Sequence, residues 1–402
     1  LSSVRLAIQE AVDALAASGL FIDRLLRGPD GKEYALTDAY TPPAAADEEL
    51  WAASPPVHVK DIHVSIGVDK GGSPSSVKIV AGIINQSRPN WISNTILVAV
   101  CPAAKDKHAQ LTAVLAEHLL QLRQLVRQGI VVAGTRRAVR LFASGGYEAL
   151  CAIHGHKGPN ASMPCLWCYS TRAPSAAQAA LDAQFGTLQD LQGVRLLRTA
   201  AHLRAMHATH SSGSDGALVL AVHRSIAQRP LIGIDPRQVV PIPLHILLGV
   251  TIRLLRLAIE IVILCKSPAI GRIYADELAV VLRVAVLVEP TPYHGGVFIG
   301  RDCHAIAEKS DVVCATLAPL VPKKDSDAYA KAWELWRGVR STLSRAAVIS
   351  REESVRFRAD TREFVTLLCR SFPWVRVSPK LHALWCHAPD FLDRFGSIGL
   401  YG

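Results

Sequence analysis

Residues 57–69 carry the sequence VHVKDIHVSIGVD. Apolar, β-branched residues recur here at nearly every second position, which is the pattern of a β-strand with one buried face. The apolar positions are Val57, Val59, Ile62, Val64, Ile66 and Val68. We expect this strand to end at Asp69, because the turn residues Gly71 and Gly72 follow.

The segments that follow predict the rest of a sheet. The expected elements are strands at 76–84 and 94–101, a helix at 107–129, and a strand at 138–143 that ends in Ser144-Gly145-Gly146. Short, turn-rich links favour an antiparallel meander for the first three strands. Three strands, a helix and a fourth strand resemble the opening of a ribonuclease H-like fold, an α/β (α+β) fold with a mixed sheet.

The remainder of the chain is expected to be mainly helical. Helical periodicity runs through residues 1–27, and the later helix candidates are 175–185, 245–265, 276–288, 328–346 and 351–372. Loops are expected at 41–56 and 207–216. The predicted organisation is an N-terminal helical extension and linker (1–55), the first part of the core (56–150), a large, mainly helical insertion (151–380) and the start of a final core segment (381–402).

Composition excludes a disordered chain and favours a polyanionic partner. The 402 residues are 50% hydrophobic and 19% charged, and the formal net charge is +10. Such a charge suits nucleic acid, although charge alone fits a basic soluble protein equally well. Nine cysteines scattered over a long chain indicate a reducing compartment rather than a disulfide framework.

The apolar stretch at 244–265 resembles a membrane span only at first sight. It carries Arg253, Arg256 and Glu260 near its middle. Charged side chains are costly in a bilayer, so we interpret the stretch as a buried helix and expect no membrane association.

The clearest chemical motif is Cys165-Leu166-Trp167-Cys168. A CxxC turn can present two thiolates to one zinc ion, and His382 and His387 have a spacing suited to the other two ligands. Nearer candidates for those ligands are Cys151, His154 and His156. The alternatives are a surface CxxC with two unrelated core histidines, or a redox motif, which is disfavoured because no strand precedes it.

Two further residues are candidates for chemistry. Asp69 lies where a strand could present a carboxylate to a divalent metal ion, although an Asp before Gly-Gly is also an ordinary turn residue. His245 opens the apolar helix, where a histidine is more often a satisfied core residue than a functional one.

Together these motifs resemble the catalytic core of DDE-type transposases, of the Transib type and related to the catalytic subunit of the V(D)J recombinase. The resemblance covers about 57–402. It is carried by the CxxC with its following Thr171-Arg172, the segment HALWCHAP at 382–389, the segment FGSIG at 395–399, and Leu244-His245. It implies a structural Zn²⁺ site of Cys165, Cys168, His382 and His387, with His245 near the active site.

The same resemblance implies a function. Asp69 takes the first position of a three-carboxylate site that binds Mg²⁺ or Mn²⁺ for DNA nicking and strand transfer. DNA would be the partner, the protein would be a homodimer, and its location would be nuclear.

This sequence departs from the family pattern at the catalytic site. Gly146 stands where the second Asp is expected, and Glu148 could substitute only if the backbone aimed it differently. The third carboxylate would follow Gly402, so we interpret the chain as a degenerate, fragmentary copy that does not catalyse. The alternatives are a non-catalytic DNA-binding scaffold that keeps the zinc site, and a zinc-stabilised interaction protein without a nucleic-acid role.

Overall fold

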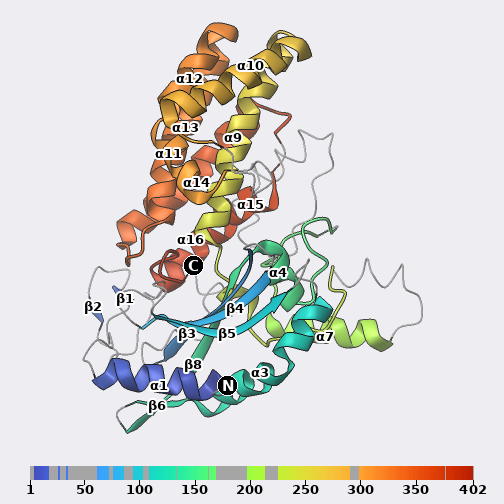
Figure 1. Ribbon diagram of the computed structural model, residues 1–402, viewed down its shortest axis with the longest axis vertical. Helices are drawn as coiled ribbons and strands as arrows, with labels where there is room; N and C mark the ends of the chain where they lie inside the picture. The colour runs from blue at the N-terminus through green and yellow to red at the C-terminus, as the bar shows by residue number, and fades with distance from the viewer. Residues whose placement is uncertain are drawn as a thin grey trace.

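The computed structural model describes thirteen segments of the chain. They are residues 4–17, 26–27, 33–34, 61–71, 76–85, 94–102, 108–132, 134–161, 163–168, 197–212, 225–289, 298–375 and 377–401. A sheet with helices on both sides forms one end of the molecule, and a long helical lobe extends from it (Figure 1). The protein is therefore a mixed α/β fold with a largely helical C-terminal part, as the sequence predicts.

The central sheet has the strand order β5-β4-β3-β8. Its strands are β3 (Ile62–Gly71), β4 (Ser76–Ile83), β5 (Thr95–Pro102) and β8 (Val139–Gly145). β3, β4 and β5 form the predicted antiparallel meander, and β8 pairs with β3 in parallel. On the free side of β8, Val239 makes an isolated parallel bridge to Ala143.

Strand β3 differs from the prediction at its C-terminal end. Asp69 pairs with Lys78, and the strand continues to Gly71, so Asp69 lies inside the strand rather than in a turn. The predicted start of this strand at 57 lies outside the described residues. Its alternating apolar residues from Ile62 to Val68 are buried, as expected for a strand in the middle of a sheet.

The two faces of the sheet are covered differently. α1 (Val4–Ala17) and α3 (His108–Gln128) lie below the sheet in Figure 1, where they contact β4, β5 and β8 and share one buried apolar cluster with the residues of β3. On the other face, the ring of Phe142 lies 5.0 Å from that of Phe395 and 4.6 Å from that of Tyr401, measured between centroids. Residues near the C-terminal end of the described chain therefore cover the upper face of a sheet whose strands come from much earlier in the sequence.

A close approach of β3 and β8 requires glycine at the end of β8. Gly145 has φ +143°, and a Cβ atom there would lie 2.0 Å from the carbonyl oxygen of Val68. The next residue, Gly146, donates its backbone N–H to that same oxygen at 3.2 Å. Gly146 is the N-cap of α4 (Tyr147–Ile153), with φ −56° and no atom within 4 Å of a Cβ placed on it.

The helical lobe comprises α9 (Pro243–Cys265), α10 (Pro268–Val281) with a π turn (Leu282–Val286), α11 (Gly300–Glu308), α12 (Ser310–Leu317), α13 (Lys323–Leu343) and α14 (Arg351–Ser371). Its core includes Trp336, which stacks on Phe364 with ring centroids 5.8 Å apart and donates its indole N–H to Thr251. Arg253 and Glu260 form a two-pronged ion pair along α9, at 2.6 and 2.8 Å. None of the described helices is both long and apolar enough to cross a membrane.

Several local expectations differ from the structure. Residues 207–212, predicted as loop, belong to α7 (Ala200–Ser212). The hairpin of β6 (Ile130–Val132) and β7 (Thr135–Arg137) and the short helices α11 and α12 are not evident from periodicity, because each is only three to nine residues long. The helical pattern predicted to residue 27 stops earlier, since β1 (Leu26–Arg27) pairs with β2 (Glu33–Tyr34). The elements predicted at 41–56 and 175–185 lie outside the described residues.

The two adjacent glycines provide a matched test of the β3–β8 contact. Gly145→Ala is expected to lower the free energy of unfolding by about 2 kcal/mol or more, because its methyl group would meet the Val68 carbonyl in a strained backbone conformation. Gly146→Ala is expected to lower the free energy of unfolding by less than about 1 kcal/mol, because its only effect is that alanine is a weaker N-cap residue than glycine. Urea denaturation of both variants measures the difference, and equal losses would contradict the close approach described here.

Candidate metal centre

Two histidines are brought onto one helix face by an irregular turn. α15 (Pro379–His382) continues into a π-helical turn, η6 (Ala383–His387), and then into α16 (Ala388–Phe395). Residues five apart in a regular α-helix point about 140° away from each other, whereas a π turn hydrogen-bonds residues five apart. The Nε2 atoms of His382 and His387 consequently lie 3.1 Å apart.

The CxxC turn is held rigidly by a buried arginine. Arg198 has no exposed surface, and its Nε donates to the carbonyl oxygens of both Cys165 and Cys168 at 3.0 Å. Its backbone N–H donates to the Trp167 carbonyl at 2.8 Å. The backbone N–H of Cys168 also donates to Cys165 Sγ at 3.4 Å, so both sulfur atoms are presented to the same side.

Aromatic residues connect this turn to the rest of the fold. The Tyr147 hydroxyl donates to the Pro164 carbonyl and accepts the backbone N–H of Leu166 at 3.1 Å. Trp167 stacks on His387 with ring centroids 5.2 Å apart and donates its indole N–H to the Val239 carbonyl at 2.9 Å. The CxxC turn is thus fixed to α4, to the end of the sheet and to one of the two histidines.

The four predicted ligands meet at one point. Cys165 Sγ lies 3.2 Å from His387 Nε2, and Cys168 Sγ lies 3.3 Å from His382 Nε2. All four donor atoms fall within 4.8 Å of one another. A tetrahedral zinc ion, with bonds of about 2.3 Å to sulfur and about 2.0–2.1 Å to nitrogen, separates its donors by roughly 3.3–3.8 Å. The cluster therefore has the size and the donor chemistry of a zinc site.

The electrostatics of the cluster favour a thiolate next to an imidazolium when no metal is bound. The hydrogen bond from Cys165 holds the pKa of Cys168 well below its ordinary value despite burial, while burial raises that of Cys165. Burial opposes a charge on His382, but Cys386 and Cys168 outweigh it and raise the pKa of His382 to about 10. A metal ion would replace these protons, since thiolate and neutral imidazole are the forms that bind zinc.

The nearer alternative ligands do not join the cluster. The imidazole of His156 donates from Nε2 to the Met163 carbonyl at 3.0 Å and accepts the Gly158 N–H on Nδ1 at 3.0 Å, so both of its nitrogens are used. His154 donates from Nδ1 to the Leu150 carbonyl at 2.9 Å. Within the described part of the chain, Cys165, Cys168, His382 and His387 form the one group arranged to hold a metal ion. The buried Cys2His2 group could thus bind a metal such as zinc.

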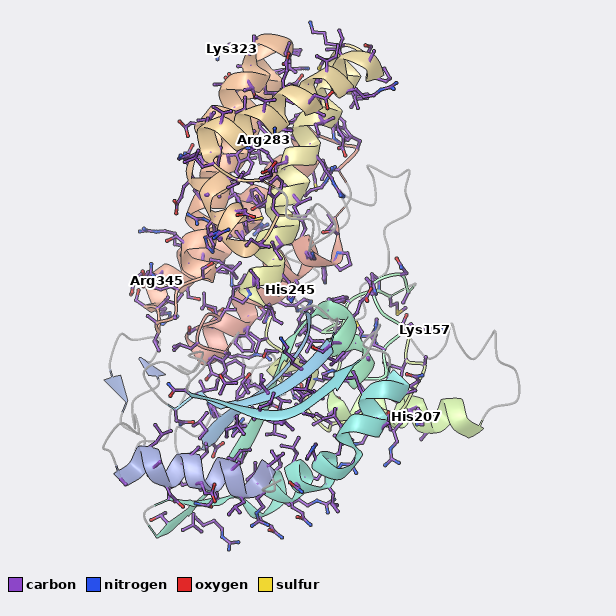
Figure 2. All side chains as sticks on the ribbon, in the orientation of Figure 1. Lys157, His207, His245, Arg283, Lys323 and Arg345 are labelled. Carbon is purple, nitrogen blue, oxygen red and sulfur yellow. The ribbon has the colours of Figure 1, made fainter. Side chains whose placement is uncertain are left out.

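The candidate catalytic positions lie beside this centre, at the end of the sheet. Asp69 adjoins Val68, whose carbonyl accepts the N–H of Gly146. Glu148 is exposed in the first turn of α4. His245, near the start of α9, lines a small cleft with Gly145, Tyr147 and Lys380, and Figure 2 shows it at the end of α9 that faces the sheet.

The end of the described chain adds residues that sequence reasoning did not identify. The Tyr401 hydroxyl lies 2.9 Å from His63 Nδ1, and the Tyr401 carbonyl accepts the hydroxyl of Ser65 at 3.3 Å. Ser65 also lies 3.3 Å from Ser144, oxygen to oxygen. Burial, with a smaller effect of Arg140, lowers the pKa of His63 to about 3, so it is a neutral core residue. Nothing in the local sequence marks His63, Tyr401 or Arg198 for these roles.

Comparison with known proteins adds no further information on the site. The chain matches no protein-family model, and no curated protein sequence is significantly similar to it.

We expect the full chain to bind one zinc ion and His387→Ala and Cys168→Ser to lose it, because each substitution removes one of four ligands. Metal analysis of the purified protein gives the stoichiometry, and substitution with Co²⁺ gives absorption bands typical of tetrahedral sulfur and nitrogen ligation. A chelator should lower the Tm of the wild-type chain but leave that of His387→Ala unchanged.

Cys151→Ser is the matched control, because Cys151 is a buried cysteine near the CxxC turn that lies outside the cluster. It should retain the zinc stoichiometry of the wild-type chain. Loss of zinc in Cys151→Ser with retention in His387→Ala would assign the ligands differently.

Proposed function

We propose that this chain carries the catalytic core of a DDE-type transposase or recombinase-like protein that processes DNA, with an active site that has degenerated. The observation that carries the proposal is the contact between two parallel strands at the same end of the sheet. Gly145 is the partner of Val68 in the register of β8 with β3, and the next residue, Gly146, donates its backbone N–H to the Val68 carbonyl. Two carboxylates at positions 69 and 146 would be neighbours, as a two-metal site requires.

The strand order supports a ribonuclease H-like interpretation. Three antiparallel strands, a helix, the short β6–β7 hairpin and a strand parallel to the first follow one another in the chain, and Val239 then makes an isolated parallel bridge beyond that last strand. The helical lobe follows this fifth position and returns to the sheet through the segment that carries His382 and His387. This arrangement fits a helical insertion that a zinc site fixes to the catalytic domain.

The proposed chemistry is in-line phosphoryl transfer. Mg²⁺ or Mn²⁺ ions held by clustered carboxylates would activate water, and then a DNA 3′-hydroxyl, and would neutralise the charge on the phosphate. Asp69 is the carboxylate that this chain supplies, whereas Gly146 supplies none and exposed Glu148 lies two residues further along α4. His245 would border the site, and the Cys2His2 centre would have a structural role because its four protein ligands complete a tetrahedron.

Restoring the carboxylate tests the site directly. Gly146→Asp should fold normally, because the position has room for a side chain and Asp is a better N-cap than Gly. We expect it to bind Mn²⁺ at least about tenfold more tightly than the wild-type chain, a gain of about 1.4 kcal/mol. Electron paramagnetic resonance measures the binding, and Asp69→Ala/Gly146→Asp and Gly146→Ala are the controls, neither of which should show the gain.

Two outcomes would contradict different parts of this proposal. A folded Gly146→Asp variant with unchanged Mn²⁺ affinity would show that positions 69 and 146 do not share a metal site. Metal-dependent nicking of supercoiled DNA by the wild-type chain, lost in Asp69→Ala, would show that the site is active rather than degenerate.

A non-catalytic DNA-binding scaffold is the second candidate, favoured by Gly146 together with the net charge of +10. Both candidates predict that the zinc-loaded chain binds duplex DNA with an affinity that falls at least about tenfold between 50 and 200 mM salt, since phosphate contacts release counterions. Fluorescence anisotropy over this range measures the dependence. Absence of binding at the lowest salt would instead favour a zinc-stabilised protein-interaction module.

A further inference from the structure

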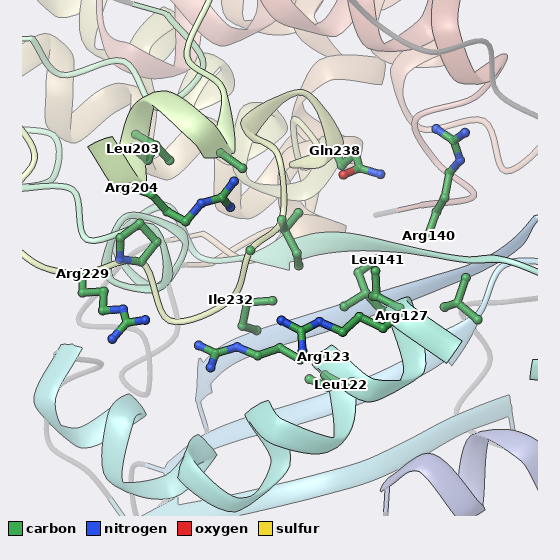
Figure 3. A pocket seen from close by; sticks show the side chains of 16 residues that line it. Leu122, Arg123, Arg127, Arg140, Leu141, Leu203, Arg204, Arg229, Ile232 and Gln238 are labelled. Carbon is green, nitrogen blue, oxygen red and sulfur yellow. The ribbon is translucent and has the colours of Figure 1, made fainter. Parts of the chain in front are cut away.

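A pocket of about 600 Å³ lies beside the free edge of β8, near the start of that strand. The candidate metal centre lies near the other end of β8. Its walls come from the C-terminal half of α3, the start of β8, α7 and the segment 229–234 (Figure 3). Five arginines line it: Arg123, Arg127, Arg140, Arg204 and Arg229. None of the residues that line it is acidic.

Most of these arginines are available to a ligand. Arg140 is paired with Asp61, and Arg123 donates to the Leu231 carbonyl at 3.2 Å. Arg127, Arg204 and Arg229 are exposed, and none of the three forms an ion pair with a carboxylate of the described residues. A concave surface lined with charge of one sign concentrates its electrostatic potential and attracts counter-charged ligands.

Four of the five arginines converge on the pocket from both sides, whereas the side chain of Arg140, paired with Asp61, points away from them. Figure 3 shows Arg123 and Arg127 reaching from α3 into the space that Arg204 and Arg229 border on the other side. The guanidinium group of Arg204 lies over Gly233, with Nη1 3.7 Å from where a Cβ would be. The segment 229–234 is tied to α3 by His108, which donates to the Arg229 carbonyl at 2.8 Å, and by Arg123. The pocket is therefore formed before any ligand binds.

The volume of the pocket and the chemistry of its walls restrict the class of ligand that it can bind. Small-molecule sites commonly enclose about 300–1,000 Å³, whereas a DNA-binding module covers an extended surface of at least about 600 Å². Apolar side chains, among them Leu122, Leu203 and Ile232, line the pocket between the arginines. Guanidinium groups bind phosphate with paired hydrogen bonds and stack on planar rings. These properties suit a compact ligand that has several phosphates and an uncharged part.

We propose that this pocket binds a compact organic polyphosphate of the nucleoside triphosphate class. The site is separate from the candidate carboxylate site, because Arg140 lies near the start of β8, six residues or roughly 20 Å along an extended chain from Gly146, which directly follows the end of that strand. Polyphosphate binding at this pocket is therefore independent of DNA cleavage and of zinc binding.

Calorimetric titration of ATP into the zinc-loaded full chain, without added Mg²⁺, tests the proposal. The double variant Arg204→Gln/Arg229→Gln should weaken ATP binding at least tenfold, and Arg127→Gln alone should weaken it about threefold. Arg256→Gln/Arg370→Gln is the matched control, because it removes the same charge from exposed positions on the helical lobe and should change the affinity less than twofold. Adenosine, which has no phosphate, should show no binding in the same range.

Three results would overturn the proposal. The first is the absence of any heat of binding with millimolar ATP. The second is an equal loss of ATP affinity in the pocket variants and the control variant. The third is displacement of ATP by a short DNA duplex whose own binding shows the same dependence on Arg204 and Arg229. The last result would assign the pocket to a nucleic-acid surface. Circular dichroism establishes that each variant is folded. Because Arg127 lies on α3, on the opposite wall from Arg204 and Arg229, Arg127→Gln tests the contribution of the pocket to ATP affinity independently of the double variant.

Discussion

The convergence of two thiols and two imidazoles fixes how the parts of this protein meet. Cys165 and His387 are 222 residues apart in the chain, and Cys168 and His382 are 214 apart. Each pair brings the region that follows β8 into contact with the helix that follows the lobe. Because the donors are buried and held by Arg198, Tyr147 and Trp167, a bound ion would stabilise a junction that the surrounding hydrogen bonds already define.

This junction sets the position of α16 over the sheet. α16 begins at Ala388, directly after His387, and carries Phe391 and Phe395 onto Phe142 of β8. Tyr401 completes the same aromatic layer and reaches His63 and Ser65 of β3. Tyr147 provides a second link, because it binds the CxxC turn and directly follows Gly146. The metal centre and the end of the sheet are consequently parts of one rigid unit, so displacement of one would displace the other.

The sequence predicts those parts of the structure in which chemistry or periodicity is distinctive. The alternation in β3 predicts the central strand, and the CxxC with its distant histidines predicts the cluster, because few other roles require that combination.

The resemblance to transposases, rather than spacing alone, favours His382 and His387 over the nearer His154 and His156. In the structure, backbone groups occupy both nitrogens of His156, which no local pattern could indicate. Arg198 is equally invisible in the sequence, since only the folded turn shows why a fully buried guanidinium is needed there. The arginines of the β8-edge pocket come from four separate segments, so only tertiary structure groups them.

The π-helical turn between the two histidines has a consequence for how relatives of this protein can be recognised. Such a turn holds about one residue more than an α-helical turn, so it accommodates a single inserted residue without rotating the helices on either side. A homologous chain with its histidines four apart in an uninterrupted α-helix would present the same two nitrogens on one face. The spacing of five in this chain is therefore one of two equivalent solutions, and a search pattern for distant relatives should allow a gap of one residue at this point.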